Sequence, residues 1–297
     1  GYARGKVLGG CSSINAMIYM RGQKSDFDYW ESLGNRNWGW SDVLPIYKKS
    51  EDYQHGADEF HGVGGELRVE ERRVNWEILD AWRDAAEECG IKKINEFNRG
   101  DNSGNSYFQM NQHKGSRWSA TKAYLRPIIS RKNLTVLTYA HVKKIRIETS
   151  DRVKVAKGVV ASINKSDAKF FSSKKEVILC AGSIGSPQIL QLSGVADKAL
   201  LEKMGIPLIH ELKGVGENLH DHLQIRSVYE VQNTITLNQR INSFFGKIKM
   251  GLEYFIFKTG PLTISRSKFM ALSRYMSKLS LFGHQASYNI CKKPADY

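Results

Sequence analysis

The apolar and polar positions along the chain predict a mixture of helices and strands. Residues 75–90 place apolar side chains at helical spacing, which predicts an amphipathic helix with Asn75 as its N-cap and Gly90 as its stop. Residues 26–52 indicate an aromatic-rich helix, a loop and a second helix, for which Ser41 is a suitable N-cap.

A run of strands follows a further predicted helix. Residues 117–131 predict that helix, which should be regular only up to Pro127, because a proline disfavours the helical conformation of the residue before it. The alternation of apolar and polar residues then predicts three strands, at 134–148, 155–163 and 169–181. Short polar turns separate the three strands, so we expect them to form a β-meander.

Residues 176–194, EVILCAGSIGSPQILQLSG, change their period within one run. VILCA is a continuous apolar stretch that predicts a strand, and GSIG predicts a tight turn. The remainder predicts a short helix, with Ser186 as N-cap, Pro187 at the first helical position and Gly194 as the stop. A small helix and a strand are expected within 200–212.

Composition and charge exclude several classes of protein. At 297 residues, 41% hydrophobic and 25% charged, the chain has the composition of a globular protein with a sizeable core, in one large domain or two. No apolar run approaches the ~20 residues of a membrane span. The net charge of +14 is spread along the whole chain, so we expect a basic protein rather than a nucleic-acid binder.

Three stretches could hold a ligand. RGKVLGGCSSIN (4–15) is either an anion cradle or a solvated turn before an apolar segment. In GSIGSP (182–187), a predicted strand delivers a Gly/Ser turn to a helix N-terminus, where ligands can bind, although the pattern alone favours a structural turn. In GVGENLHDH (214–222), His220 and His222 have no third ligand at a helical spacing, so we expect no metal site there.

Taken together, these stretches resemble one known family. RGKVLGGCSSINAMIYMRG (4–22) resembles the first signature of the glucose–methanol–choline (GMC) oxidoreductases, and GSIGSPQILQLSGV (182–195) resembles the second. GSRWSATKAYLRP, NLTVLTYAHVKKI and GVGENLHDH are similar to the landmarks between and after them, in the family's order. The resemblance runs from residue 1 to about 265, and its style is closest to insect glucose-dehydrogenase-like members.

The resemblance implies an α/β fold, α+β overall, in which part of a Rossmann-type FAD domain carries a β-meander. Residues 1–224 would be the incomplete FAD-binding portion, with a lid or loop insertion near 26–70. Residues 225–297 would begin an antiparallel-sheet substrate domain that departs from the family pattern after 265. The implied reaction is oxidation of an alcohol or sugar hydroxyl, with hydride transfer from the substrate carbon to flavin N5.

The resemblance also implies which residues contact FAD. The positions that match those contacts in the first signature are Val7, Gly9, Gly10, Cys11, Asn15, Ala16, Met17 and Ile18. The backbone of Val142 stands where members meet the adenine. Ile14 replaces the histidine of members that attach the flavin covalently, so we expect non-covalent FAD.

The departures from the family suggest a fragment. These 297 residues contain neither the GxGxxG βαβ unit nor the catalytic histidine pair of the family, and His284 is not expected to replace that base. We therefore expect part of a chain about twice as long, with no catalytic residue of its own and poor affinity for FAD. The alternative is a non-catalytic, GMC-derived binding or interaction protein. Substrate identity, electron acceptor, localisation and oligomeric state are not indicated by the sequence.

Overall fold

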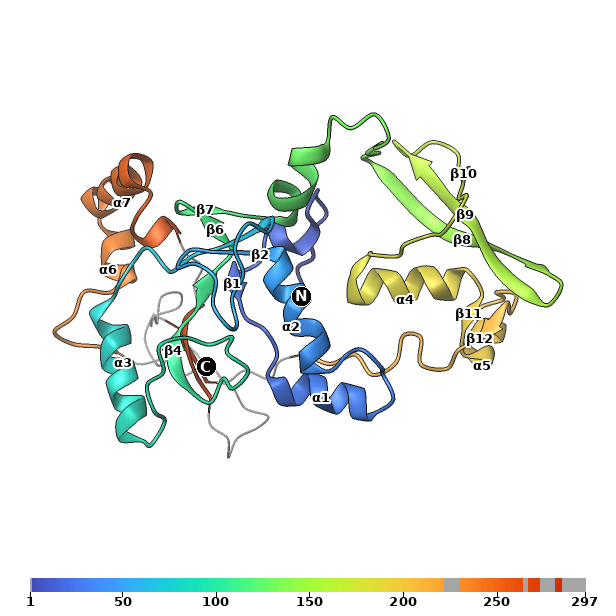
Figure 1. The fold of residues 1–297 in the computed structure, drawn as a ribbon. Coiled ribbons are helices and arrows are strands. Elements are labelled where there is room, and N and C mark those ends of the chain that lie inside the picture. Colours follow the sequence, from blue (N-terminus) through green and yellow to red (C-terminus); the bar gives the residue numbers. More distant parts are fainter. Residues whose placement is uncertain (1, 222–229, 264–266, 273–280, 285–297) are drawn as a thin grey trace, which may run out of the picture. The chain divides into compact units, whose positions relative to one another are not determined.

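The computed structural model describes residues 2–221, 230–263, 267–272 and 281–284 (Figure 1). The chain divides into two compact units, of which the first consists of Gly1–Arg131 with Leu223–Tyr297 and the second of Lys132–His222. Both units mix helices with strands, as the predicted fold class requires.

Two helices near the start of the first unit pack through aromatic side chains. Helix α1 spans Lys24–Ser32 and α2 spans Trp40–Ser50, and Phe27, Trp40 and Val43 form one buried cluster between them. The predicted pair of helices is confirmed, but Ser41 is not the cap. The backbone nitrogen of Trp40 donates to Oδ1 of Asp28 at 3.0 Å, so α1 supplies the acceptor for the first turn of α2.

Short strands build the middle of the first unit. Strand β1 (Ile18–Tyr19) pairs antiparallel with β5 (Gln109–Met110), and β2 (Glu51–Tyr53) pairs parallel with β3 (Leu67–Val69). The remaining strands of this unit are β4 (Gly104–Tyr107), β6 (Gln112–His113), β7 (Ser116–Arg117), β13 (Ser267–Leu272) and β14 (Leu281–His284). Strand β13 lies between β14 and β4 and is antiparallel to both.

Helix α3 (Glu77–Glu88) carries the predicted amphipathic pattern. Its apolar face buries Leu79 and Ala86 against Trp76 and Tyr107. The predicted stop is confirmed, because Gly90 adopts φ +83° and ends the helix in the left-handed conformation that glycine tolerates. The predicted cap is wrong: Trp76, not Asn75, precedes the first turn.

The helix predicted at 117–131 is shorter and more irregular than expected. It consists of a π-helical turn, η2 (Thr121–Leu125), followed by a 3₁₀ turn, η3 (Arg126–Ile128). The backbone nitrogen of Arg126 donates to the carbonyl of Thr121, five residues back, which is the π pattern. Pro127 lies inside the 3₁₀ turn rather than after a helix.

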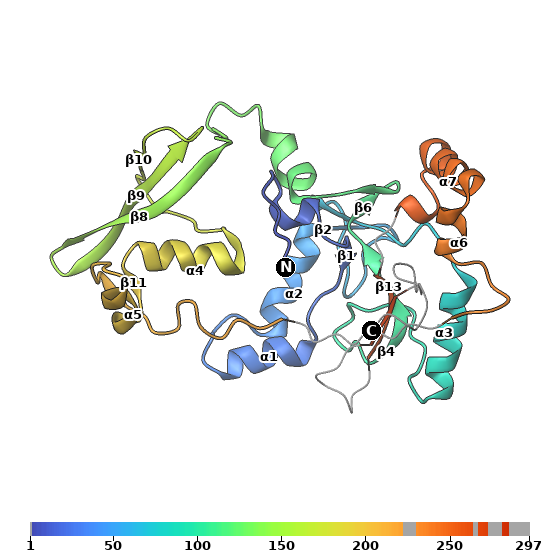
Figure 2. The same cartoon turned by 180° about the vertical axis from the view of Figure 1, so that it is seen from behind.

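Helix α6 (Leu237–Asn242) lies at the end of α3 where α3 begins, and α7 (Phe244–Phe257) lies beyond α6 in both views (Figures 1 and 2). The guanidinium of Arg240 stacks 4.9 Å from the ring centre of Trp76 and joins α6 to the cluster at α3. After α7, the nitrogen of Gly260 donates to the carbonyl of Arg73 at 3.2 Å, and the 3₁₀ turn η4 (Pro261–Thr263) follows. Both ends of this helical segment are thus attached to the first unit.

The second unit begins with the predicted β-meander. Strands β8 (Ala140–Ser150), β9 (Val153–Ile163) and β10 (Lys169–Ser172) pair antiparallel in the order β10-β9-β8, which confirms the prediction. The first strand begins six residues later than its apolar pattern suggested, at Ala140 instead of 134.

The strand predicted at VILCA is wrong. Residues 175–181 form no strand in the described part of the chain, and the Ile178 side chain is 76% exposed. Helix α4 (Gly182–Leu192) begins four residues before the predicted cap Ser186, whose hydroxyl accepts a hydrogen bond from the nitrogen of Ala181 at 3.0 Å. Gly194, with φ +80°, ends the helix as predicted.

The second unit closes with a small parallel pair of strands. Strand β11 (Val195–Ala196), helix α5 (Lys198–Lys203) and strand β12 (His210–Glu211) follow α4, as expected for a small helix and strand in this stretch. The Ser193 hydroxyl accepts from the backbone nitrogen of Ile145 at 2.8 Å, so the end of α4 is fixed to β8. The unit's sheet and helices therefore form one packed body.

Candidate functional site

The glycine pair of the opening loop makes a tight, left-handed turn. Gly9 adopts φ +89° and Gly10 φ +53°, and together they start the 3₁₀ helix η1 (Gly10–Ser13). A Cβ on Gly10 would meet no atom within 4 Å, so that side of the turn is open to a ligand. A Cβ on Gly9 would lie 2.5 Å from the Thr121 hydroxyl and 2.6 Å from that of Ser13. Only glycine fits at this point of the loop.

The two serines shape the loop instead of facing a ligand. The Ser12 hydroxyl donates to the carbonyl of Gly9 at 2.5 Å and accepts from the nitrogen of Ala120 at 2.9 Å. The Ser13 hydroxyl donates to the carbonyl of Leu8 at 2.9 Å. The backbone nitrogens of Ile14 and Asn15 both donate to the carbonyl of Cys11, so the expected row of free N–H donors is not present after the serines.

Arg117 at the end of β7 clamps this loop. Its Nη1 donates to the carbonyl of Ser12 at 3.1 Å and to Oδ1 of Asn15 at 2.9 Å, and its Nη2 donates to the carbonyl of Asn15 at 2.8 Å. No carboxylate of the described residues forms an ion pair with Arg117, and burial lowers the pKa of its guanidinium. The first unit therefore places an uncompensated positive charge beside the loop.

Two buried polar atoms near the loop have no hydrogen-bond partner within the part of the chain that the structure describes. They are the Thr121 hydroxyl, at the start of the π-helical turn, and Nδ2 of Asn111. The backbone nitrogen of Asn111 donates to the carbonyl of Met17 at 2.7 Å, which fixes Asn111 against the end of the loop. Buried donors are normally satisfied, so both atoms suit a polar ligand.

The predicted contact residues outside the glycine pair differ in exposure and in the unit to which they belong. Val7 and Cys11 are exposed on the loop, and Asn15 is exposed with its Oδ1 held by Arg117. Met17 is 8% exposed and packs in the core with Phe97, Phe108 and Met110, so only its backbone faces the loop. The other residues of the first signature, Ala16 and Ile18, are half-buried. Val142 belongs to the second unit, on β8 opposite Ala161.

Exposed apolar side chains complete the loop. Val7 is 53% exposed, Leu8 42% and Ile14 47%, around the open glycine turn. An aromatic ring system with a phosphate tail matches this combination of apolar rim, open turn, positive charge and unsatisfied donors. The residues present thus fit a flavin nucleotide.

The other two predicted stretches lie in the second unit. Gly182 adopts φ +82°, and a Cβ there would meet nothing within 4 Å. His220 and Asp221 are exposed, and His222 lies outside the described residues. Among the residues that the structure describes, no group of three histidine, cysteine or acidic side chains could hold a metal.

A buried charge cluster in the first unit was not predicted from the sequence. Glu51, on β2, is fully buried and lies 2.9 Å from Nη2 of Arg21 and 3.1 Å from Nδ1 of His61. It also accepts a hydrogen bond from the backbone nitrogen of Gly62 at 2.9 Å. The Arg21 guanidinium donates further to the carbonyl of Phe60 at 2.7 Å. The cluster therefore connects the loop between β2 and β3 to Arg21, two residues after the end of β1.

A second carboxylate completes this cluster. Nε2 of His61 lies 3.3 Å from Oε1 of Glu96, and the imidazole stacks on the ring of Tyr53 with the two centres 4.0 Å apart. Burial alone lowers the pKa of His61, but Glu51 and Glu96 outweigh burial and raise it to about 9. The bonds from His61, Arg99 and Tyr53 likewise outweigh burial and lower the pKa of Glu96 to about 2. His61 is therefore an imidazolium between two carboxylates at neutral pH.

We expect Gly9→Ala to destabilise the first unit by about 2 kcal/mol or more, because alanine adds both left-handed strain and a collision with Thr121 and Ser13. Gly34→Ala is the matched control, since Gly34 has φ +97° with nothing within 4 Å of a Cβ. Gly34→Ala should cost only the backbone strain, about 1 kcal/mol. Urea unfolding measures both, and equal losses would mean that the loop does not pack tightly.

Comparison with known proteins gives one family and a consistent set of relatives. A family model described as GMC oxidoreductase matches residues 2–224. The chain is 38% identical over 257 residues to an oxygen-dependent choline dehydrogenase of Brucella ovis, covering 86% of this chain and 46% of that protein. It is 36% identical over 253 residues to the mitochondrial choline dehydrogenase of Homo sapiens, covering 85% of this chain and 42% of that protein.

Solved structures agree with these relatives. An FAD-dependent oxidoreductase from Chaetomium thermophilum superposes with a TM-score of 0.80 at 27% identity, over 91% of this chain and 49% of that one. Pyridoxine 4-oxidase from Mesorbium loti gives 0.73 at 26% identity, over 96% and 50%. The chain spans about half the length of the relatives it matches.

Proposed function

Because this chain belongs to the GMC oxidoreductase family, we propose that it supplies part of the FAD site of an enzyme that oxidises the CH–OH group of an alcohol or a sugar. The observation that carries the proposal is the loop that Arg117 holds. This loop contains the family's first signature with its open glycine turn, and buried polar atoms without a partner lie near it. FAD is the cofactor of the related oxidoreductases, and the loop's residues fit it.

The residues proposed to contact FAD are those of the first signature together with one residue of the second unit. Within the signature, the backbone of Gly9, Gly10 and Cys11 supports the close approach of a ring edge. The Asn15 side chain is proposed as a polar contact, with Arg117 fixing its orientation through Oδ1. The others are Val7, Ala16, Met17, Ile18 and Val142. Ile14 has no nucleophilic atom, so we propose that FAD is held without a covalent bond.

When bound, FAD would supply the hydride acceptor for the reaction. This chain's own contribution is binding and orientation. The exposed apolar rim of Val7, Leu8 and Ile14 would exclude water from the ring, and the Arg117 charge would favour electron-rich or anionic parts of the cofactor. We propose no general base among the described residues, since none lies at the loop in a position to accept a substrate proton.

The substrate class rests on the related proteins. Choline and pyridoxine, named for two of them, each carry a primary alcohol, which supports a small alcohol or a sugar as the substrate. A glucose-like substrate is proposed only because the sequence is most similar in its motifs to insect glucose-dehydrogenase-like members. We also propose that residues 1–224 form part of the FAD-binding domain and that residues 225–297 begin the substrate-binding domain.

The native protein offers the most direct test. An antibody raised against the 297-residue chain would isolate the protein from its source, and denaturation should release free FAD. Addition of choline, glucose or a simple primary alcohol without oxygen should bleach the bound flavin. A folded native protein without flavin would contradict the proposal and favour the non-catalytic, binding alternative. The 297-residue chain alone should bind added FAD only weakly.

Replacing Arg117 with methionine should loosen the loop without unfolding the unit. The change removes three hydrogen bonds and leaves the carbonyls of Ser12 and Asn15 without their donors, at a cost of about 1–3 kcal/mol. Hydrogen exchange measured by mass spectrometry should speed up in the peptide covering 5–17. Arg117→Lys should rescue little, because a lysine lacks the planar fork.

The control for this experiment is Arg131→Met, an exposed arginine of the same unit. Its exchange in residues 5–17 should match that of the unaltered chain. Equal protection in Arg117→Met and the control would mean that the serine hydrogen bonds alone hold the loop.

A further inference from the structure

Helix α7 exposes an unusual number of large apolar side chains. Seven of them are between 45% and 81% exposed, and they are Phe244, Phe245, Ile248, Leu252, Phe255, Ile256 and Phe257. At 3.6 residues per turn, six of the seven project within an arc of about 120°, and only Phe257, the last residue of the helix, lies outside it. The six form one continuous stripe along the helix, which we call the α7 stripe.

The opposite side of the helix holds it on the first unit. Met250 is buried, and Glu253 and Tyr254 are half-buried on the same side. Below the helix, Arg240 stacks on Trp76, and beyond its end Gly260 is bonded to the Arg73 carbonyl. The α7 stripe therefore faces outward on a helix that is fixed to the first unit, and an exposed apolar surface of this kind marks an interaction site.

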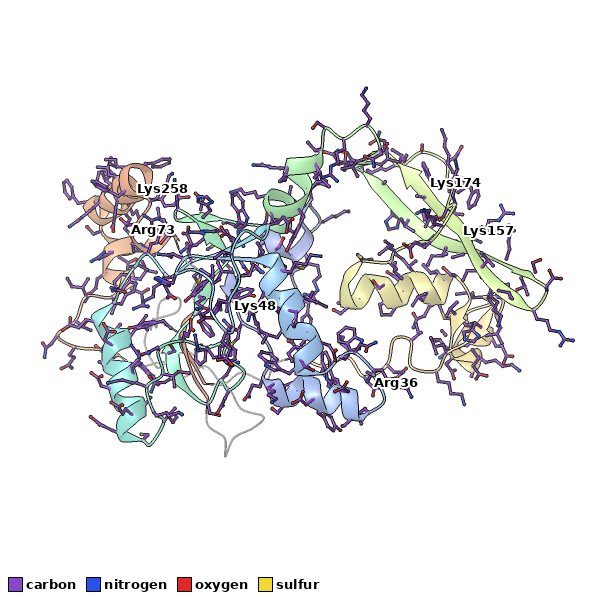
Figure 3. The ribbon with its side chains drawn as sticks, viewed as in Figure 1. Arg36, Lys48, Arg73, Lys157, Lys174 and Lys258 are labelled. Atoms are coloured by element: carbon purple, nitrogen blue, oxygen red, sulfur yellow. The ribbon has the colours of Figure 1, made fainter. Side chains whose placement is uncertain are left out.

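Lysines border the α7 stripe on both sides. On the helix surface, Lys249 flanks one edge, while Lys247 and Lys258 flank the other. None of the three forms an ion pair with a carboxylate of the described residues, and the one acidic residue of the helix, Glu253, is on the inner side. Figure 3 marks Lys258 at α7 and Arg73 close to it. The ammonium of Lys258 lies 4.4 Å from the ring centre of Tyr254.

We propose that α7 lies in the surface of an anionic lipid bilayer, with the α7 stripe in the boundary between headgroups and acyl chains. An in-plane helix of this kind has an aromatic apolar face, with basic residues that reach the lipid phosphates from its edges. The contact area between two proteins is, by contrast, depleted of lysine. The proposal concerns attachment at a surface: no helix among the described residues is long and apolar enough to cross a membrane.

Charge complementarity extends beyond the helix. The chain carries a net charge of +14, and Arg73 and Arg240 belong to the segments that hold α7. Each basic residue near an anionic surface strengthens attachment severalfold, and salt weakens it. We therefore expect the apolar stripe and the lysines to contribute together.

Co-sedimentation with vesicles tests this proposal. The 297-residue chain should bind vesicles of phosphatidylcholine with phosphatidylserine, bind phosphatidylcholine alone far more weakly, and dissociate as salt is raised. The double variant Phe245→Ser with Phe255→Ser should lower the affinity by at least about tenfold. Lys247→Gln with Lys249→Gln should lower it by about tenfold on the anionic vesicles only. Tyr139→Ser, at an 84% exposed aromatic residue outside α7, should change nothing.

Several results would overturn the proposal. The phenylalanines of the double variant are 81% and 75% exposed, so folding should be intact and circular dichroism should confirm it. Vesicle binding that the double variant retains would place attachment elsewhere. Self-association that the double variant abolishes, without vesicle binding, would mean that a second copy covers the stripe. If the 297-residue chain binds vesicles but the native protein does not, further polypeptide covers the α7 stripe in the native protein.

Discussion

Replacing Glu51 with alanine is expected to lower the free energy of unfolding of the first unit by about 3–5 kcal/mol. The variant leaves the guanidinium of Arg21 and the imidazolium of His61 buried without the carboxylate that faces both. It also removes the acceptor for the backbone nitrogen of Gly62. Each of these groups lost water on folding, so the loss exceeds that of an exposed ion pair.

Tryptophan fluorescence during urea unfolding measures this effect in one unit alone. All six tryptophans, Trp30, Trp38, Trp40, Trp76, Trp82 and Trp118, lie within residues 1–131 and so report only on the first unit. Asp84→Ala is the control, because it breaks the ion pair with Lys93 at a carboxylate that is 63% exposed. The control should lose less than about 1 kcal/mol. An equally small loss in Glu51→Ala would mean that the cluster does not stabilise the loop.

The stability of the first unit should fall as the pH rises through the alkaline range, because of His61. The pKa of His61 is raised from 6.5 to about 9 in the folded chain, so the folded state binds the proton more tightly than the unfolded state does. Its contribution is complete below pH 6.5 and is lost as the pH rises through about 9, at up to about 1.4 kcal/mol per pH unit. Burial lowers this pKa, and the carboxylates of Glu51 and Glu96 raise it, while Arg21 faces Glu51 and Tyr53 stacks on the imidazole.

The variant His61→Gln isolates this titration. The difference in unfolding free energy between the unaltered chain and His61→Gln should shrink between pH 6.5 and 9, as measured by urea titrations at successive pH values. His55→Gln is the control, since His55 lies in the same loop with a side chain 56% exposed, and it should keep the alkaline slope. A pH-independent difference for His61→Gln would mean that His61 is neutral in the folded chain.

Local patterns predicted those elements whose partners are close in sequence. The alternation in β8 and β9 gave the meander, because each strand pairs with its neighbour along the chain. Gly90 and Gly194 were predicted as helix stops from residue type, since the left-handed conformation there favours glycine. That the opening loop contacts a ligand was expected from its resemblance to the family's first signature, and it stays a prediction.

Features that depend on residues distant in the chain could not be predicted from the sequence. The cap of α2 comes from Asp28 on another helix, so the suitable Ser41 is not used. VILCA has the composition of a buried strand, but the described residues contain no strand beside it. Arg21, Glu51, His61 and Glu96 are far apart in the chain, and no local spacing reveals that they meet. Arg117 stood within a quoted family landmark, GSRWSA, yet only the structure connects it to Asn15.

The division of the chain has a consequence for the order in which it folds during synthesis. The second unit is continuous, and its β8–β9 hairpin and α4 contain every residue they need once about residue 222 has left the ribosome. The first unit is interrupted: Arg73 meets Gly260 only after the whole second unit has been made. Closing so long a loop is slow, so the second unit should fold first. The first unit should complete its folding only after the residues that follow the second unit have been made. Until then, the apolar surface at Trp76 that α6 covers stays exposed and could bind chaperones.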